Sequence, residues 1–256
     1  QKAADIGISS VPLVDLYANV ESRIAKSGGT VHFGSSVTSL DTHTVTLSDN
    51  TKLDADAVIC AVPVERVSRL IDPQTQATDP RFAMLDAFTH SPILGVHLRF
   101  DRPVMGDMPH CVLVDKSTQW LFRKDASGTA VHAVISAADN WLTIPEDEIG
   151  RRVAADIQSC LSGAREARVV SVRAVKEKLA TFAPLPGLER SRPCVTGPSG
   201  IILAGDYTNT GWPATMEGAA RSGYTAAAAV LGESAETMTT QSLPIAKVAR
   251  LFGLKA

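Results

Sequence analysis

Apolar residues in the first part of the chain recur in spacings that predict a helix followed by strands. Residues 12–26 carry an apolar side chain every three or four positions and are followed by Gly28, which predicts a helix that ends there. We expect a strand directly after Gly28-Gly29 and further short strands beyond it. Residues 57–62 form an unbroken apolar run, which predicts a central buried strand that Pro63 ends.

From about residue 88 the pattern changes to alternating apolar and polar positions. This alternation predicts strands at residues 94–100, 111–114, 120–123, 130–136 and 169–175. Before the last of these strands, Pro145 and Glu146 open an amphipathic helix that extends to Leu161. After Pro184 the chain is expected to return to the first lobe. The pattern therefore predicts two interleaved lobes, the second of which is inserted into the first.

A strand, a short loop and a helix are expected near the C-terminal end. Residues 201–204 are all apolar and predict a buried strand, which Gly205 ends. Pro213 suits the first turn of a helix, where a missing N–H costs nothing. Small residues recur at helical spacing up to the helix stop at Gly232. The first N–H groups of this helix, together with the positive end of its dipole, predict a site for a ligand acceptor or an anion.

This run, IILAGDYTNTGWPATMEGAARSG at residues 201–223, resembles the C-terminal flavin-binding motif of the amine oxidase and phytoene desaturase superfamily. Four earlier segments resemble the middle FAD-domain segment of that superfamily, and they lie at residues 28–33, 37–40, 45–47 and 54–63. Within the superfamily, the squalene-associated FAD-dependent desaturases, also called hydroxysqualene dehydroxylases, are the branch that residues 96–103, 119–122 and 176–187 resemble. The resemblance covers most of the chain in the expected order.

The resemblance implies an α/β (α+β) fold with two lobes and a tail. Residues 1–87 and 184–232 would form an FAD/NAD(P)-binding-type lobe, and residues 88–183 an inserted substrate lobe made of a mixed β-sheet and a helix. Residues 233–256 would be a linker and an amphipathic C-terminal segment. The superfamily opens with a Gly-x-Gly-x-x-Gly turn that holds the FAD pyrophosphate, and this sequence has no such turn. Since the chain also starts at Gln1, we expect a longer enzyme whose N-terminal segment supplies the missing Rossmann unit, and weak FAD binding by this piece alone.

The resemblance also assigns residues to the flavin. Thr215 and Met216, with Ala214 beside them, would meet the C2 carbonyl of the ring, where a helix start stabilises the charge of the reduced cofactor. Gly205 would let the backbone approach FAD, and Asp206 would accept hydrogen bonds from ribityl hydroxyls. A carboxylate at this position is also typical of a loop or a helix cap.

Three earlier residues match positions near the same cofactor. Val37 corresponds to the strand residue whose backbone brackets the adenine, although a plain apolar strand residue explains its identity equally well. Ala61 and Pro63 correspond to a turn that passes near the cofactor, and an ordinary turn is an equal alternative.

Three aromatic residues are candidates for a substrate tunnel. Trp212 precedes the flavin helix, whereas Trp120 and Phe122 are two positions apart on one expected strand and so share a face. Their π-faces would stabilise a developing allylic cation on a polyprenyl chain. Taken one at a time, each also suits ordinary core packing.

Composition removes several other classes of protein. The 25 lysines and arginines against 27 acidic residues give a net charge of −2, which provides no field for nucleic acid. The four cysteines are widely spaced, so we expect reduced, mostly buried thiols and neither a disulfide framework nor a metal site. The six histidines lack metal spacing, and no Gly-x-Ser-x-Gly elbow supports a serine hydrolase. No catalytic residue can be identified from these patterns.

The last residues form a basic amphipathic pattern. Ile245, Val248, Leu251 and Phe252 lie on one face of a helix, with lysines and an arginine elsewhere. Such a helix can lie on a membrane surface, and it can equally pack on its own domain. We therefore expect a cytoplasmic protein, with peripheral membrane contact as one of the two interpretations of this segment.

The sequence thus predicts an FAD-dependent oxidoreductase of the squalene-associated type that acts on an apolar C30 isoprenoid, such as hydroxysqualene or squalene, in hopanoid or carotenoid precursor synthesis. A phytoene-type desaturase and a flavin amine oxidase are the enzymatic alternatives. A folded lobe without catalysis or a cofactor of its own is the alternative of another class.

Overall fold

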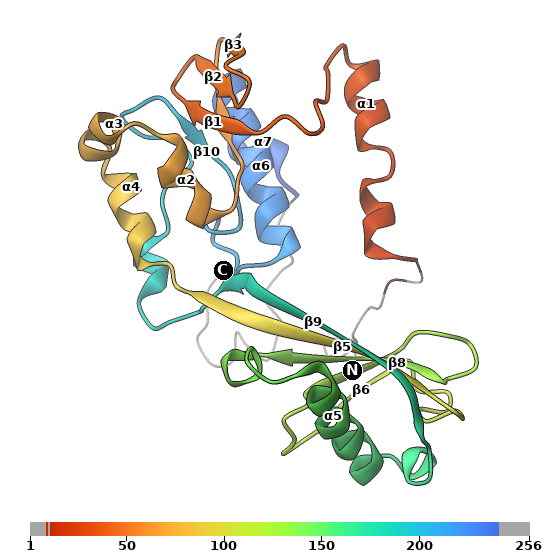
Figure 1. Ribbon diagram of the computed structural model, residues 1–256. Coiled ribbons are helices and arrows are strands. Elements are labelled where there is room, and N and C mark those ends of the chain that lie inside the picture. Colours follow the sequence, from red (N-terminus) through yellow and green to blue (C-terminus); the bar gives the residue numbers. More distant parts are fainter. Residues whose placement is uncertain (1–8, 10, 241–256) are drawn as a thin grey trace, which may run out of the picture. The chain divides into compact units, whose positions relative to one another are not determined.

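The computed structural model describes residue 9 and residues 11–240, and the chain divides into two compact units (Figure 1). Unit 1 consists of Gln1–Arg81, Cys194–Thr210 and Glu217–Ala256. Unit 2 consists of Phe82–Pro193 and Gly211–Met216. The chain thus leaves unit 1 at residue 81, six residues before the boundary expected at residue 87, and returns to it at residue 194.

Unit 2 is built on a five-stranded antiparallel sheet in the order β6-β7-β8-β5-β9. Its strands are β5 His90–Phe100, β6 His110–Val112, β7 Trp120–Arg123, β8 Ala130–Ser136 and β9 Val169–Phe182. Its helix is α5 Glu146–Cys160. Short helical turns connect these elements, and they are α4 Pro80–Met84, which crosses the unit boundary, η3 Leu85–Ala87, η4 Asp139–Trp141, η5 Ser162–Ala164 and η6 Leu188–Ser191.

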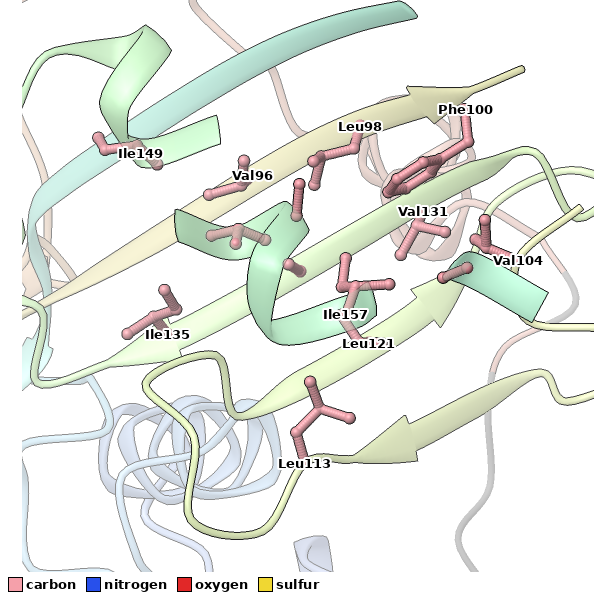
Figure 2. Close-up of a cluster of buried hydrophobic side chains, with 14 of the residues drawn as sticks. Val96, Leu98, Phe100, Val104, Leu113, Leu121, Val131, Ile135, Ile149 and Ile157 are labelled. Carbon is pink, nitrogen blue, oxygen red and sulfur yellow. The ribbon is translucent and has the colours of Figure 1, made fainter. Parts of the chain in front are cut away.

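The core of unit 2 lies between one face of this sheet and α5. Alternate residues of the central strands are buried because successive side chains of a strand point to opposite faces. Figure 2 shows the sheet residues Val96, Leu98, Leu121, Val131 and Ile135 gathered beneath Ile149 and Ile157 of α5. Helix α5 covers one face of the sheet, so residues at the intervening positions are left on the other face.

The expected strands of unit 2 are present, although β5 begins earlier than expected, at His90, β6 is shifted to His110–Val112, and β9 is longer than expected. β7 and β8 have the bounds that the alternation predicts. β9 continues seven residues beyond the predicted end, to Phe182, because its backbone pairs with the beginning of β5 after a register shift between Ser91 and Ile93. Among the added residues Phe182 alone is buried, so they carry no alternating apolar pattern from which the extension could be predicted.

Unit 1 contains two small sheets and several helices. An antiparallel sheet is formed by β1 Val37–Leu40, β2 Thr44–Leu47 and β3 Lys52–Asp54. A parallel pair is formed by β4 Ile59–Cys60 and β10 Ile202–Leu203. The helices are η2 Leu13–Tyr17, α1 Val20–Lys26, α2 Val64–Leu70, α3 Pro73–Thr78, α6 Met216–Leu231 and α7 Ala235–Met238.

Three expectations for unit 1 need correction. Residues 29–36, all of which the structure describes, form no strand, and Phe33 is 76% exposed. The run expected to be a central strand pairs with a single neighbour within the described residues, and Ile59 is 41% exposed. The helix expected at residues 12–26 is divided into η2 and α1, whose side chains are exposed. The reason is the same in each case, because an apolar run becomes a buried element only where another element covers it.

Candidate functional site

The candidate site is built on the parallel pair β4 and β10. Ile202 lies opposite Ile59, and Leu203 lies opposite Cys60. The Ala204 N–H donates to the Cys60 carbonyl at 2.9 Å, which extends the pairing by one step. The carboxyl ends of both strands therefore lie at one edge. In open α/β sheets this edge is where ligands bind.

The turns that follow these strands carry four of the residues expected at the cofactor. Ala61 and Pro63 follow β4, and Pro63 is the N-cap of α2. Gly205 and Asp206 follow β10, and both are half-buried. The structure thus brings these four residues to the same edge of the strand pair in unit 1.

Gly205 occupies a position that a larger residue cannot take without strain. Its φ is +149°, and a Cβ atom there would lie 2.3 Å from Cε1 of Tyr207. The Gly205 N–H donates to Ser222 Oγ at 2.7 Å, and Thr208 Oγ1 donates to the Gly205 carbonyl at 2.8 Å. Ser222 is a buried residue of α6, so this bond joins the turn directly to the helix.

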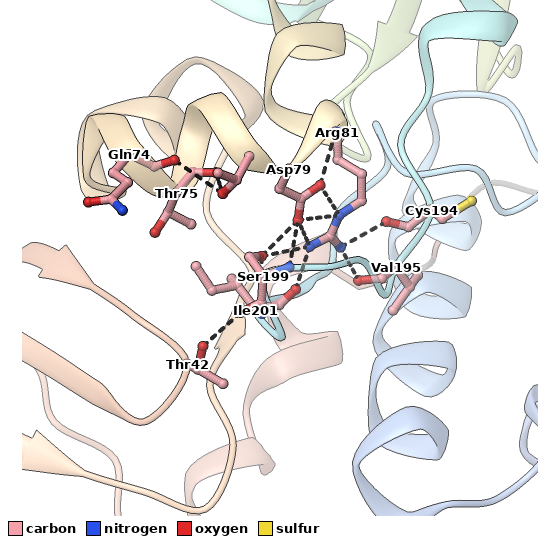
Figure 3. A network of polar contacts seen from close by, with 10 residues as sticks. Thr42, Gln74, Thr75, Asp79, Arg81, Cys194, Val195, Ser199 and Ile201 are labelled. Atoms are coloured by element: carbon pink, nitrogen blue, oxygen red, sulfur yellow. Dashed lines mark hydrogen bonds and ion pairs between the residues drawn. The ribbon is translucent and has the colours of Figure 1, made fainter.

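A buried ion pair holds the segment that leads into β10. Arg81 Nη2 lies 2.7 Å from Asp79 Oδ2, and the two residues are 4% and 0% exposed (Figure 3). The guanidinium also donates to the carbonyls of Val195 and Ile201, each at 2.8 Å. Ser199 Oγ donates to the same carboxylate at 2.7 Å. One side chain thereby fixes both ends of the loop before β10.

This network makes the stability of unit 1 depend on pH. Burial alone would raise the pKa of Asp79, but hydrogen bonds from Arg81 and Ser199 outweigh it and lower the pKa from 3.8 to about 2. A carboxyl with a lowered pKa stabilises the folded state fully above its unfolded value, and this contribution is lost as pH falls through the folded value.

We therefore expect Asp79→Asn to be less stable than the wild type at neutral pH, with a difference that shrinks between pH 3.8 and about 2. Urea unfolding at a series of pH values measures the difference. A difference that stays constant across this window would show that the Asp79 charge does not contribute.

Helix α6 comes after the turn at Gly205, and it begins later in the chain than expected. The helix begins at Met216, three residues after the proline expected in its first turn. The residues that it buries are Gly218, Ser222, Ala226 and Ala228. Ile202, Ala204 and Ala226 share one apolar cluster, so α6 packs against β10. Met216 is 50% exposed at the helix start.

The loop before α6 is held by a second buried arginine. Arg192 Nη1 donates to the Trp212 carbonyl at 2.5 Å and to Glu189 Oε2 at 3.0 Å. The Arg192 side chain is 1% exposed. Trp212, Ala214 and Thr215 belong to unit 2 together with this arginine, and the chain passes back to unit 1 after Met216.

Trp120 and Phe122 do share a face, as expected, and that face is the one opposite α5. Their rings are nearly parallel, at 8°, with centroids 5.9 Å apart. The His110 ring stacks beside both of them, and His132 lies on the other side of Phe122. Cross-strand register explains the cluster, because His110 and His132 lie directly opposite Phe122 on β6 and β8.

Val37 lies in a different part of unit 1 from the strand pair. It begins β1 and pairs with Leu47 in the antiparallel sheet. Its assignment to the adenine therefore stays a prediction.

The sequence analysis did not identify the residues that hold the site, namely Asp79, Arg81, Arg192, Tyr207 and Ser222. No local pattern reveals them, because their partners are distant in the sequence or belong to backbone.

The cysteines and the C-terminal segment complete the comparison with the sequence. All four cysteines are free, but Cys60 alone is buried, whereas Cys160 and Cys194 are exposed, so the expectation of mostly buried thiols was wrong. Burial raises the pKa of the Cys60 thiol.

The amphipathic segment at residues 245–252 lies outside the described residues. Within the described part, no helix combines the length and apolarity needed to cross a bilayer.

Several known proteins are similar to this chain in sequence. Residues 13–231 match the family described as flavin containing amine oxidoreductase. A hydroxysqualene dehydroxylase of Sinorhizobium fredii is 36% identical over 180 residues, covering 70% of this chain and 39% of the relative. A 15-cis-phytoene desaturase of Synechococcus elongatus is 28% identical over 204 residues, covering 74% of this chain and 43% of the relative. The chain therefore spans less than half the length of these curated relatives.

The fold also matches solved structures. Reduced UDP-galactopyranose mutase aligns with a TM-score of 0.63 at 13% identity, covering 94% of this chain and 54% of that one. At this identity the likeness concerns the fold alone.

Proposed function

Because the chain belongs to the family of flavin-containing amine oxidoreductases, we propose that the protein containing it is an FAD-dependent oxidoreductase that acts on a C30 isoprenoid of the hydroxysqualene or squalene type. The observation that carries this proposal is the turn at Gly205, at the carboxyl edge of the strand pair and bonded to the buried face of α6. The similarity to a hydroxysqualene dehydroxylase supports the choice of substrate class.

Gly205 and Asp206 at this edge of unit 1 fit one end of FAD. Gly205 presents backbone without a side chain, and Asp206 is a half-buried carboxylate that can accept hydrogen bonds from ribityl hydroxyls. Thr215 and Met216 are exposed where α6 begins, and peptide groups at a helix start stabilise an anionic ring. When bound, FAD supplies the two-electron chemistry. The phosphate-binding turn of the family has no counterpart in this sequence, so we assign no residues to the pyrophosphate.

The face of the unit 2 sheet opposite α5 is our candidate for substrate contact. The half-buried rings of Trp120 and Phe122 are nearly parallel, and their π-faces would attract a cationic centre and exclude water from an apolar chain. The neighbouring ring nitrogen His110 Nδ1 is buried and has no hydrogen-bond partner among the described residues. The other rings in contact with Trp120 and Phe122 belong to His110 and His132. An aromatic face of this kind suits an isoprenoid chain.

Incubation of the full-length protein with hydroxysqualene and a reductant is expected to yield squalene, which extraction and lipid analysis would detect. Trp120→Ala and Phe122→Ala should each lower kcat/KM by roughly five- to thirtyfold, because each removes an aromatic contact to the developing charge worth about 1–2 kcal/mol. Phe33→Ala removes an exposed ring in unit 1 and serves as the matched control.

Parallel incubations with phytoene and with a primary amine decide between the alternatives. Turnover of phytoene without turnover of hydroxysqualene would transfer the protein to the desaturases, and turnover of the amine alone would make it an amine oxidase. A full-length protein that binds no flavin would contradict the oxidoreductase assignment itself.

A further inference from the structure

The face of the unit 2 sheet opposite α5 carries a depression that the proposed function does not use. It has a volume of about 360 Å³ and lies at the end of the sheet where β5 finishes and β9 begins. Its lining consists of His97, Leu98, Arg99, Lys124, Ala130, Val131, Ser171, Val172 and Arg173. Four of these side chains carry basic nitrogen atoms, and no acidic side chain is among them.

Sheet register explains why the basic groups surround a hollow. Arg99 lies on β5, between β8 and β9, and its neighbours on these two strands are the small residues Ala130 and Ser171. One step along β5, His97 lies opposite Arg173. Long basic side chains therefore stand around a floor of short ones. Lys124, which directly follows β7, adds a third permanent cation.

The two acidic residues beside the depression do not neutralise it. Asp125 lies 3.6 Å from Arg99, and Glu146 lies 3.9 Å from Arg173, so both ion pairs are long. Each acid has shorter bonds elsewhere: Asp125 accepts from two hydroxyls at 2.8 and 2.9 Å, and Glu146 accepts from a backbone N–H at 2.7 Å. Lys124 has no ion-pair partner among the residues that the structure describes.

His132 lies next to His97, and its surroundings lower the pKa of its ring. Its ring stacks on His97 with centroids 4.2 Å apart and an interplanar angle of 2°. Burial lowers the pKa of His132, and electrostatic interactions with His97 and Lys124 lower it further, to about 4. His132 is therefore neutral at neutral pH.

We propose that this depression is a binding site for the phosphate groups of a polyanion. Guanidinium groups bind phosphate through paired N–H donors, and a lysine contributes a point charge. Ser171 adds a hydroxyl donor on the floor. Three permanent cations around one open hollow favour a diphosphate, or several anionic headgroups of a membrane surface, over a single carboxylate, since attraction increases with the charge of the ligand. This site is independent of the oxidoreductase assignment.

Titration of the full-length protein with inorganic pyrophosphate, followed by calorimetry, tests the site directly. We expect saturable binding that weakens with added salt, because the cations are exposed. The double variant Arg99→Gln with Lys124→Gln should lose roughly tenfold or more in affinity, whereas Lys124→Arg should keep it. Arg165→Gln is the matched control, because it removes one exposed cation of unit 2 outside the depression. Melting temperatures of all variants check that the fold is intact.

A second arm identifies the source of the phosphate. The protein is sedimented with vesicles of phosphatidylcholine alone and with vesicles that also contain phosphatidylglycerol. Pyrophosphate that displaces the protein from the anionic vesicles would support the site and assign it to a headgroup. Saturable pyrophosphate binding without vesicle binding would support it and assign it to a soluble diphosphate. The proposal is overturned if pyrophosphate does not bind, or if Arg165→Gln weakens binding as much as the double variant.

Discussion

Replacing Arg81 with methionine is expected to lower the free energy of unfolding of unit 1 by about 3–5 kcal/mol, because it leaves the buried carboxylate of Asp79 without a counter-charge. The substitution also removes the donors for the carbonyls of Val195 and Ile201, which fix the loop before β10. Chemical denaturation measures the loss. In the full-length protein, flavin content should fall with it, since the same loop leads to Gly205.

The control for this experiment is Arg151→Gln on α5. Arg151 is 70% exposed and pairs with acidic residues one turn away on the same helix, so its removal should cost about 0.5 kcal/mol or less. If the two variants were equally stable, the buried network would contribute no more than a surface ion pair.

Gly205→Ala is the second change with a large expected effect. The added Cβ would lie 2.3 Å from the Tyr207 ring, and the backbone would keep a φ of +149° that alanine rarely adopts. We expect a loss of about 2–4 kcal/mol in unfolding free energy, since both the ring and the backbone must move.

Gly223→Ala provides a contrast on helix α6. A Cβ at Gly223 would meet no atom within 4 Å, and alanine is favoured over glycine inside a helix by about 1 kcal/mol. This variant should therefore be neutral or slightly more stable. Equal destabilisation of both variants in thermal unfolding would show that Tyr207 does not restrict the turn at Gly205.

Sequence patterns predicted those elements whose apolar positions alternate over several residues. β7 and β8 were predicted in full, because each buries one face against α5 and exposes the other. The parallel pair was harder, because β4 and β10 are two residues long and their apolar runs extend beyond the pairing. The strand expected after Gly29 is absent, and Phe33 in this segment is exposed because none of the described elements packs against it.

In the site, too, features set by neighbouring residues could be predicted from the sequence, whereas contacts between distant residues could not. The turn at Gly205 could be located from a strand, a glycine and a helix in succession. Its glycine was interpreted as room for a ligand, whereas the structure adds an internal reason in the Tyr207 ring. Arg81 could not be recognised, because the carbonyls that it binds lie 114 and 120 residues further along the chain.

This separation also decides the order in which the chain can fold during synthesis. Phe82–Pro193 of unit 2 is continuous, so its five strands can pair as soon as that stretch leaves the ribosome. β4 has been made long before, but its partner β10 does not yet exist, and closing such a long loop costs conformational entropy. Until Cys194–Thr210 emerges, β4 cannot pair with β10, and Arg81 cannot bind the carbonyls of Val195 and Ile201. A ribosome that stalls in this interval therefore releases a folded unit 2 attached to an unfinished and aggregation-prone unit 1.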